Sequence, residues 1–358
     1  MSLDRLTDFM VGLIAHPLAD FKSSSLLAQR ERALAADPDL LDKEFQDGRE
    51  SVVGKECNTM PAGLIVTRCT PNAKAARRAQ RLDLVSRGAH GCPDHAASAA
   101  RLRRDMDEVE HARLAKHVYL KYDENTPDEL KAPPPGYLEV SPEELAELGL
   151  QQPLLTPDNT SFRAAVYKKD PMVWGADARP IYELAFRGST LAKEDWVNNM
   201  AQNANRESSY YERAVGIGNL INKAGATAAV HLVGHSLGGG LSMAAQGGSG
   251  ASATTFNSAS LHPNTVARYS ILPDRQKADT DKIVAYQVEG EILSLTQETG
   301  LASLFTRPAI GRRFVIPPSS QALSRNDRHG IDEAIKAIEA QKSADEEAIK
   351  NCLGNPPK

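Results

Sequence analysis

Short apolar runs and longer stretches with helical spacing alternate along the chain from about residue 161 onward. The apolar runs lie at residues 164–168, 181–186, 228–233, 253–256, 283–288 and 314–316. Between these apolar runs, helical character is found in residues 210–224 and in the stretch after Ser236. Strands that alternate with helices predict a mostly parallel sheet with crossover helices. We therefore expect an α/β fold for this part of the chain.

Residues 1 to about 125 show little strand pattern and are rich in Leu, Ala, Glu, Lys and Arg. These residue types favour helix, most clearly over residues 26–47, 73–87 and 96–120. The basic run Arg101, Arg103, Arg104 is followed at once by acidic residues at 105, 107, 108 and 110. This mixture predicts a solvated, salt-bridged helix face rather than a phosphate site.

A proline-rich connector separates the two parts. Pro133, Pro134 and Pro135 cannot lie inside a helix or a central strand. Ser141 followed by Pro142 and two glutamates predicts the start of a short helix. We divide the chain into a helical N-terminal region (1–125), a connector (126–160), an α/β domain (161–345) and a tail (346–358).

Composition excludes few classes of protein. The net charge of −4 argues against a nucleic-acid partner, and no run of 18 apolar residues exists. The first residues lack the basic segment and apolar core of a cleaved signal peptide, so we expect none. Either export without a cleaved signal or a cytoplasmic location fits this pattern.

The chain contains four cysteines, Cys57, Cys69, Cys92 and Cys352. They could form two disulfides in any of three pairings, although we favour free or buried thiols. Cys92 with nearby histidines is too small a ligand set to predict a zinc site. We expect no metal.

The strongest chemical signal is Gly234-His235-Ser236-Leu237-Gly238, which follows an apolar run and precedes a helix-compatible run. A Gly-x-Ser-x-Gly sequence in this context predicts a nucleophile elbow, a sharp turn that exposes the serine at a helix N-terminus. Small residues two positions to either side let the strand and the helix approach each other. The N–H of Leu237 would then face a developing oxyanion. A purely structural turn, or a hydrolase fold that has lost its activity, is the alternative.

A serine nucleophile needs a base and an acid that orients the base. Two histidines follow Ser236, namely His262 and His329. We favour His329, because it lies in a late segment before the last predicted helix. The acid is expected after the apolar run 283–288, where Glu289, Glu291 and Glu298 are the candidates.

Three segments together resemble the class 3 lipases, the α/β-hydrolase family of the fungal triacylglycerol lipases. They are Phe186-Arg187-Gly188-Ser189, then Glu194-Asp195-Trp196, then the elbow. The resemblance covers residues 160–335 and implies an α/β-hydrolase-like sheet and cofactor-free ester hydrolysis. It implies that Ser189 donates a backbone N–H to the oxyanion. It also implies that Glu291 fills the slot where this family usually has Asp-x-Val-Pro.

The same resemblance implies a mobile lid between Trp196 and Tyr210, and an ordinary surface loop is the alternative. Trp196, His235 and His262 are the residues that we expect at the lid or the substrate pocket. His262 would shape this pocket if His329 is the base.

Further stretches, at residues 133–137, 161–167, 210–214 and 254–257, resemble bacterial lipase effectors of type VI secretion. This resemblance implies a membrane phospholipid substrate, peripheral contact with the membrane surface, and delivery to the periplasm of a target cell. It also implies a cognate immunity protein and a component of the secretion apparatus as partners. The alternatives are an intracellular carboxylesterase or triacylglycerol lipase, and an inactive hydrolase-fold binding module.

Overall fold

A computed structural model describes residues 71–354, except residue 191 and residues 294–308. Its described residues form a seven-stranded sheet in the order β1 to β7. Strand β2 pairs antiparallel with both β1 and β3, and β3 to β7 are parallel to one another. The strands are β1 (Tyr137–Leu138), β2 (Ala164–Lys169), β3 (Tyr182–Phe186), β4 (Val230–His235), β5 (Ser252–Phe256), β6 (Ile283–Val288) and β7 (Arg312–Ile316). The predicted α/β-hydrolase-like, mostly parallel sheet is confirmed.

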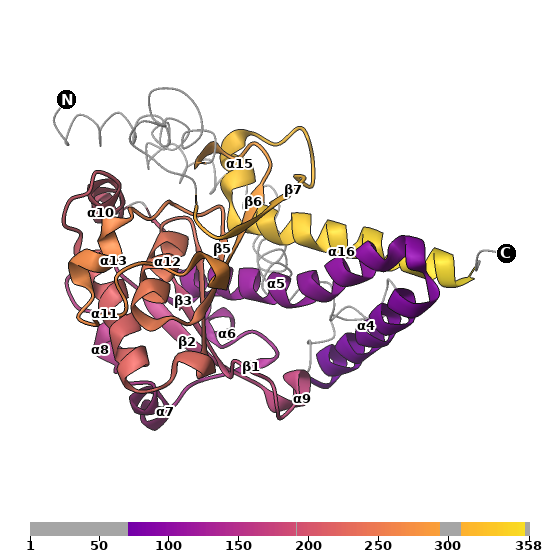
Figure 1. Cartoon of the computed structure of the whole chain (residues 1–358), viewed down its shortest axis with the longest axis horizontal. Coiled ribbons are helices and arrows are strands. Elements are labelled where there is room, and N and C mark those ends of the chain that lie inside the picture. Colours follow the sequence, from indigo (N-terminus) through magenta and orange to yellow (C-terminus); the bar gives the residue numbers. More distant parts are fainter. Residues whose placement is uncertain (1–70, 191, 294–308, 355–358) are drawn as a thin grey trace, which may run out of the picture.

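Helices cover both faces of this sheet (Figure 1). One face packs against α11 (Ser209–Lys223) and α12 (Leu237–Ser249), and the other packs against α5 (Ala96–Lys121) and α16 (Ile331–Gly354). A further helix, α4 (Pro71–Gly91), lies against α5 and α16. The shorter elements are η2 (Pro93–His95), α6 (Asp128–Lys131), α7 (Pro142–Glu147), α8 (Gln152–Leu155), α9 (Pro171–Trp174), α10 (Lys193–Asn203), η3 (Thr227–Ala229), α13 (Asn264–Tyr269), η4 (Thr280–Lys282) and α15 (Arg325–His329).

Local sequence signals account for most element boundaries. The six predicted strands are present with shifts of one or two residues at some ends. Ser141 caps α7 by accepting the N–H of Glu144, whose carboxylate accepts the N–H of Ser141 in return. The two-residue strand β1 was not predicted, because it is too short to show a periodic pattern.

The glycine-rich residues 247–249 form the last turn of α12 rather than a loop. A Cβ atom on Gly218 would collide with the carbonyl oxygen of Ala245, and one on Gly248 would come within 2.5 Å of that of Val215. Glycines here therefore serve the close packing of α11 on α12. Gly250, with a φ of +72°, ends the helix.

The solvated helix face predicted for the third helical stretch, residues 96–120, is wrong in part. Arg103 and Asp107 do form an exposed i,i+4 ion pair, with 2.7 Å between nitrogen and oxygen. Asp105, however, is fully buried and accepts a 2.9 Å hydrogen bond from the hydroxyl of Tyr286. Arg113 is fully buried too, and it is paired with two glutamates. Since α5 lies between the sheet and two other helices, its charges pair inside the protein.

The N-terminal helices and the C-terminal helix share one packed body with the sheet. Val109 and Val118 of α5 and Ile338 of α16 lie in the same apolar cluster as Val233 of β4. Moreover, α16 continues without a break past residue 345. The division into four regions stays a prediction, and the helix predicted at residues 26–47 lies outside the described residues.

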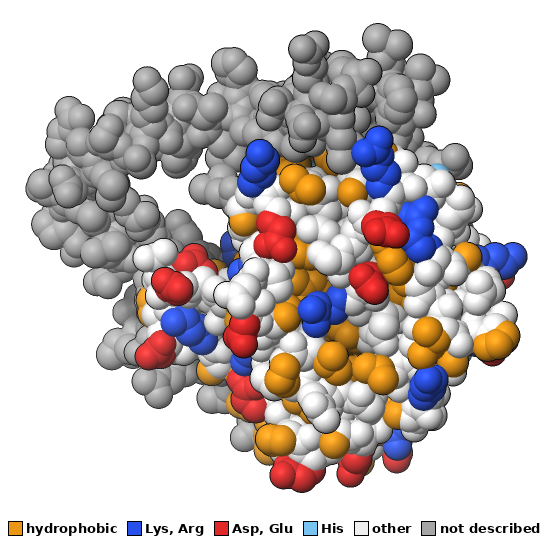
Figure 2. All heavy atoms as spheres, turned by 90° about the vertical axis from the view of Figure 1, so that its left-hand side faces the viewer, with side chains coloured by type: hydrophobic (Ala, Val, Ile, Leu, Met, Phe, Trp, Pro, Cys, Tyr) orange, Lys and Arg blue, Asp and Glu red, His pale blue; other side chains and the backbone are white. Residues whose placement is uncertain are grey.

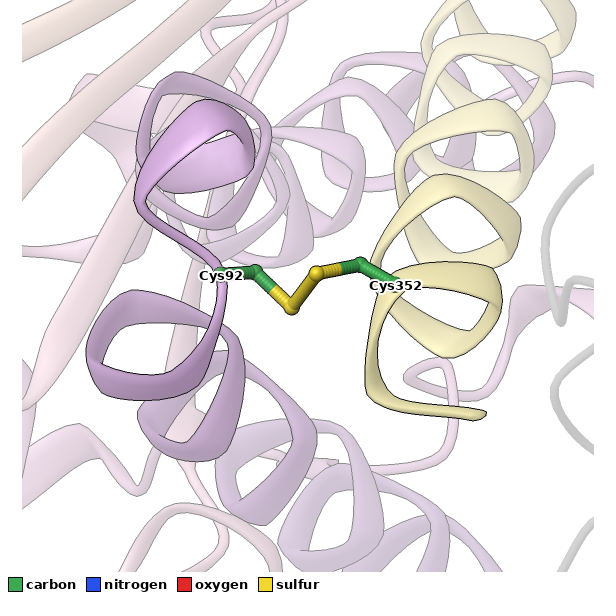
Figure 3. The surroundings of a disulfide bond; sticks show 2 residues. All are labelled: Cys92 and Cys352. Carbon is green, nitrogen blue, oxygen red and sulfur yellow. A yellow bond between two sulfur atoms is a disulfide. The ribbon is translucent and has the colours of Figure 1, made fainter. Parts of the chain in front are cut away.

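A disulfide joins Cys92 to Cys352 across 260 residues of sequence, with a Cα–Cα distance of 6.1 Å (Figure 3). It links the turn between α4 and α5 to the end of α16. The expectation of free thiols is therefore wrong for these two cysteines. Because they are 260 residues apart, the sequence alone did not indicate that they pair. Cys92 is accordingly not available as a zinc ligand. Cys57 and Cys69 lie outside the described residues.

Candidate active site

Ser236 occupies the turn between the end of β4 and the start of α12. Its φ of +57° and ψ of −125° are unusual for a residue with a side chain, as the predicted elbow requires. A Cβ atom on Gly234 would collide with the carbonyl oxygen of Gly238, and one on Gly238 would collide with that of Phe186. The two glycines therefore allow the close approach that forms the turn.

His329 lies between Ser236 and Glu291. Its Nε2 atom is 3.0 Å from the Ser236 hydroxyl oxygen, and its Nδ1 atom is 2.6 Å from a carboxylate oxygen of Glu291. The Glu291 side chain is 0% exposed and also accepts the backbone N–H of Leu293 at 2.9 Å. Because a buried carboxylate accepts only, Nδ1 carries the proton and Nε2 can accept the serine proton. This is the arrangement of a nucleophile, a base and an orienting acid.

The competing candidates lie elsewhere. The side chain of Glu289 is exposed, while its backbone N–H pairs with Ile316 of β7. His262 is partly exposed, and its Nδ1 atom accepts the N–H of Asn264 at 3.2 Å. Glu298 lies outside the described residues. Of the residues that the sequence singled out as base and acid, the structure brings His329 and Glu291 to Ser236.

Sequence reasoning missed the residues that hold the histidine segment. Asn257, directly after β5, donates from its side-chain amide to the carbonyl oxygens of Arg328 and His329, at 3.0 Å each. Its side-chain oxygen accepts the N–H of Val288 at 2.8 Å. Arg328 in turn donates to the carbonyl oxygen of Glu289 at 3.1 Å. A polar residue at the carboxyl end of a parallel strand is the signal that could have identified Asn257.

The predicted oxyanion donors flank the elbow. Leu237 is the first residue of α12, so its N–H belongs to the unpaired amides of a helix N-terminus. On the other side, a Cβ atom on Gly188 would lie 2.5 Å from the carbonyl oxygen of His235, and Ser189 comes next. The segment Gly188–Thr190, here called the oxyanion loop, therefore packs directly onto the elbow.

Asp195 fixes the oxyanion loop. Its buried carboxylate accepts the backbone N–H and the hydroxyl of Thr190, at 2.7 and 2.8 Å. It also accepts the hydroxyl of Tyr210 at 2.9 Å and that of Ser161. Both carboxylate oxygens of Asp195 therefore accept hydrogen bonds from neighbouring residues.

The segment predicted as a lid, residues 196–210, comprises most of α10, the turn that follows it and the first two residues of α11. Trp196 is half-buried and donates from its indole nitrogen to the carbonyl oxygen of Thr190 at 3.3 Å. Further along α10, Asn198 is buried and accepts hydrogen bonds from residues 208, 209 and 210. Lid motion stays a prediction. His235 is buried, with Nδ1 bonded to the Tyr119 hydroxyl and Nε2 bonded to the carbonyl oxygen of His329. Its place at the substrate pocket stays a prediction.

Within the described residues, one group of side chains has the composition of a metal site. His111, Glu183 and His231 offer ligand atoms within 4.8 Å of one another. Lys169 already pairs with Glu183 at 2.9 Å. Although burial opposes it, the charges of Glu183 and Glu108 raise the pKa of His111 to about 10. Since His111 and Lys169 both pair with Glu183, the described contacts are those of a buried ion network.

The fold and the site define an α/β-hydrolase-like protein with a candidate catalytic serine. The chain belongs to the family of Tle-like phospholipase domains, whose model matches residues 110–310. This range includes Ser236 and Glu291 and ends before His329.

The chain is also 29% identical over 221 residues to an extracellular phospholipase A1 of Serratia liquefaciens. The matched stretch covers 58% of this chain and 65% of that protein, which is slightly less than two thirds of its length. Both comparisons support a phospholipase family and hydrolysis of lipid esters. The resemblances to class 3 lipases and to type VI effectors stay predictions.

Proposed function

We propose that this protein is a serine esterase that hydrolyses membrane phospholipids. The observation that carries the proposal is the hydrogen-bonded series Ser236, His329 and Glu291, with distances of 3.0 and 2.6 Å. In this proposal Ser236 is the nucleophile, His329 is the general base, and Glu291 orients the imidazole ring.

The reaction proceeds in two halves. The Ser236 oxygen attacks the ester carbonyl while its proton moves to Nε2 of His329, and the N–H groups of Leu237 and Ser189 stabilise the oxyanion. The bond between carbonyl carbon and alcohol oxygen then breaks, and the lysophospholipid leaves with the proton from His329. Water, deprotonated by His329, attacks the acyl-serine, which releases the fatty acid and restores Ser236.

The electrostatics beside the base favour this sequence. His329 becomes positively charged during each half-reaction, and the buried Glu291 carboxylate stabilises that charge. The neighbouring ring of His235 stays neutral at physiological pH, because burial and the proximity of His329 lower its pKa to about 3. His235 therefore adds no positive charge that would oppose the proton transfer.

A phospholipid substrate is supported by the family and by the Serratia relative, whose name also favours the sn-1 ester. The face with α10 and α13 carries hydrophobic side chains between basic and acidic ones (Figure 2). On these elements, Val197 is 37% exposed, and Ile271, just after α13, is 64% exposed. Such a surface suits peripheral contact with a membrane.

We further propose that the protein acts outside the cytoplasm of the cell that makes it, as an antibacterial effector with a cognate immunity protein. The disulfide between Cys92 and Cys352 fits an oxidising compartment such as the periplasm. The extracellular relative points in the same direction. Among the described residues, no helix combines the length and the apolar character needed to cross a membrane.

The substrate proposal is tested with phosphatidylcholine vesicles that carry different acyl chains at the two glycerol positions. We expect release of the sn-1 fatty acid by the wild type and no release by Ser236→Ala. Turnover of short-chain esters or triacylglycerol without turnover of vesicles would contradict the phospholipid assignment and favour a carboxylesterase or a triacylglycerol lipase.

A further inference from the structure

Tyr119, near the end of α5, contacts two backbone segments of the candidate active site. Its hydroxyl oxygen is 3.1 Å from Nδ1 of His235. A Cβ atom on Gly188 would collide with the same hydroxyl, so the backbone of the oxyanion loop packs directly against it. A helix of the N-terminal region thus reaches the space between the oxyanion loop and the elbow.

The ring of His235 continues this path to the catalytic histidine. Its Nε2 atom is 2.7 Å from the carbonyl oxygen of His329. A carbonyl oxygen only accepts, so Nε2 carries the proton of the neutral ring and Nδ1 presents a lone pair. The Tyr119 hydroxyl must therefore be the donor to Nδ1.

Burial keeps each group in the protonation state that these bonds need. It raises the pKa of Tyr119 well above its ordinary value, so the hydroxyl retains its proton. Burial and then His329 lower the pKa of His235 to about 3, so the ring stays neutral. The Gly188 amide interacts with the Tyr119 oxygen and partly opposes the shift of the tyrosine. Tyr119 therefore donates to Nδ1 of His235, and Nε2 of His235 donates to the carbonyl oxygen of His329.

We propose that Tyr119 and His235 form a positioning relay that couples the oxyanion loop at Gly188 to the backbone of His329. The inference rests on the proposed function and extends it, because neither residue touches the reacting atoms. It gives α5 a role in the active site. Stabilisation of the transition state requires that the base and the oxyanion donors keep their positions relative to each other. Small displacements of either reduce turnover.

The structure also limits the size of the effect. Asn257 donates to the same His329 carbonyl oxygen at 3.0 Å. Loss of the relay should therefore loosen the base without removing it. We expect Tyr119→Phe to lower kcat by roughly 10- to 100-fold, in the range of one or two hydrogen bonds, with KM changed less than about twofold.

The matched control is Tyr122→Phe, three residues further along the chain and directly after α5. Its hydroxyl donates to the carbonyl oxygen of Ala164 at 2.8 Å and belongs to none of the bonds of the relay. We expect this variant to keep kcat within about twofold of the wild type. Equal losses of kcat in the two variants, or an unchanged kcat in Tyr119→Phe, would overturn the relay.

A double-mutant cycle distinguishes a relay from two separate effects. His235→Asn removes the donor to His329. If both residues act through one path, the double variant with Tyr119→Phe should be no slower than the slower single variant. A loss of kcat in the double variant equal to the product of the two single losses would mean that Tyr119 and His235 act independently, contrary to the proposal.

A third measurement does not depend on turnover. Ring nitrogen shifts of ¹⁵N-labelled histidine report the tautomer of His235, with the His235→Asn variant as the assignment control. The relay predicts the Nε2–H tautomer in the wild type, together with altered His235 and His329 resonances in Tyr119→Phe but not in Tyr122→Phe. A proton on Nδ1 of His235 would overturn the relay. Absence of any esterase activity beside the expected spectra would instead contradict the proposed function alone.

Discussion

The carboxylate of Glu291 lies 2.6 Å from Nδ1 of His329 and is completely removed from solvent. The charge cannot be hydrated, so its interaction with the imidazole ring is strong and directional. Gly290, with a φ of +73°, lets the chain turn so that Glu291 points inward after β6. A glutamate therefore reaches the position that the family resemblance assigns to an aspartate.

Glu291→Gln should reduce kcat by on the order of 10³- to 10⁴-fold while leaving the fold intact. The amide fills the same space but can donate to Nδ1, which favours the wrong imidazole tautomer. Glu289→Gln, whose side chain is exposed, is the matched control and should stay within about twofold. Similar small effects in both variants would assign the orienting acid to another residue.

His329→Ala should abolish measurable turnover, whereas His262→Ala should retain most of it. Only His329 has a ring nitrogen within hydrogen-bonding distance of the Ser236 oxygen among the described residues. Initial rates on a soluble ester, with folding checked by circular dichroism, give the comparison. The reverse ranking would transfer the role of base to His262.

Removal of the disulfide should lower stability more than activity. Cross-linking residues 260 positions apart restricts the unfolded chain, a contribution on the order of 5 kcal/mol in the chain-entropy model. Cys352→Ser should therefore melt several degrees below the wild type under oxidising conditions, and the difference should vanish in excess reductant. Equal melting temperatures without reductant would mean that the bridge contributes nothing to stability.

The ion network around His111 should make stability depend on pH. Its pKa is raised from 6.5 to about 10, so its contribution is complete below about pH 6.5 and is lost as the pH rises toward 10. We expect His111→Gln to lower the melting temperature at pH 6 far more than at pH 10. The exposed His90→Gln serves as the control. A loss for His111→Gln that does not change between these two pH values would contradict the assigned charge state.

Local patterns predicted the sheet and the elbow well. The strands of the parallel part are apolar runs bounded by helices, and the glycines beside Ser236 follow from the sterics of one turn. His329 was predicted from its place in the chain order. These features depend on neighbours in sequence or on a common topology, so one sequence suffices to predict them.

Features that depend on distant contacts were not predicted. The burial of Asp105 and Arg113 in α5 depends on partners in β6 and α16. The sequence of α5 by itself therefore resembles that of a solvent-exposed helix. The pairing of Cys92 with Cys352, and the bonds of Asn257 and Tyr119, likewise form only after the chain has folded. Periodicity carries no information about such pairs.

In the proposed mechanism, Ser236 is a nucleophile activated by His329. A fluorophosphonate probe tests it most directly, because the probe reacts covalently with an activated serine whatever the natural substrate. We expect stoichiometric labelling of the wild type, located at Ser236 by mass spectrometry, and none in Ser236→Ala. In His329→Ala, labelling should be slower by orders of magnitude. An unlabelled wild type, or equal labelling of wild type and Ser236→Ala, would contradict the claim.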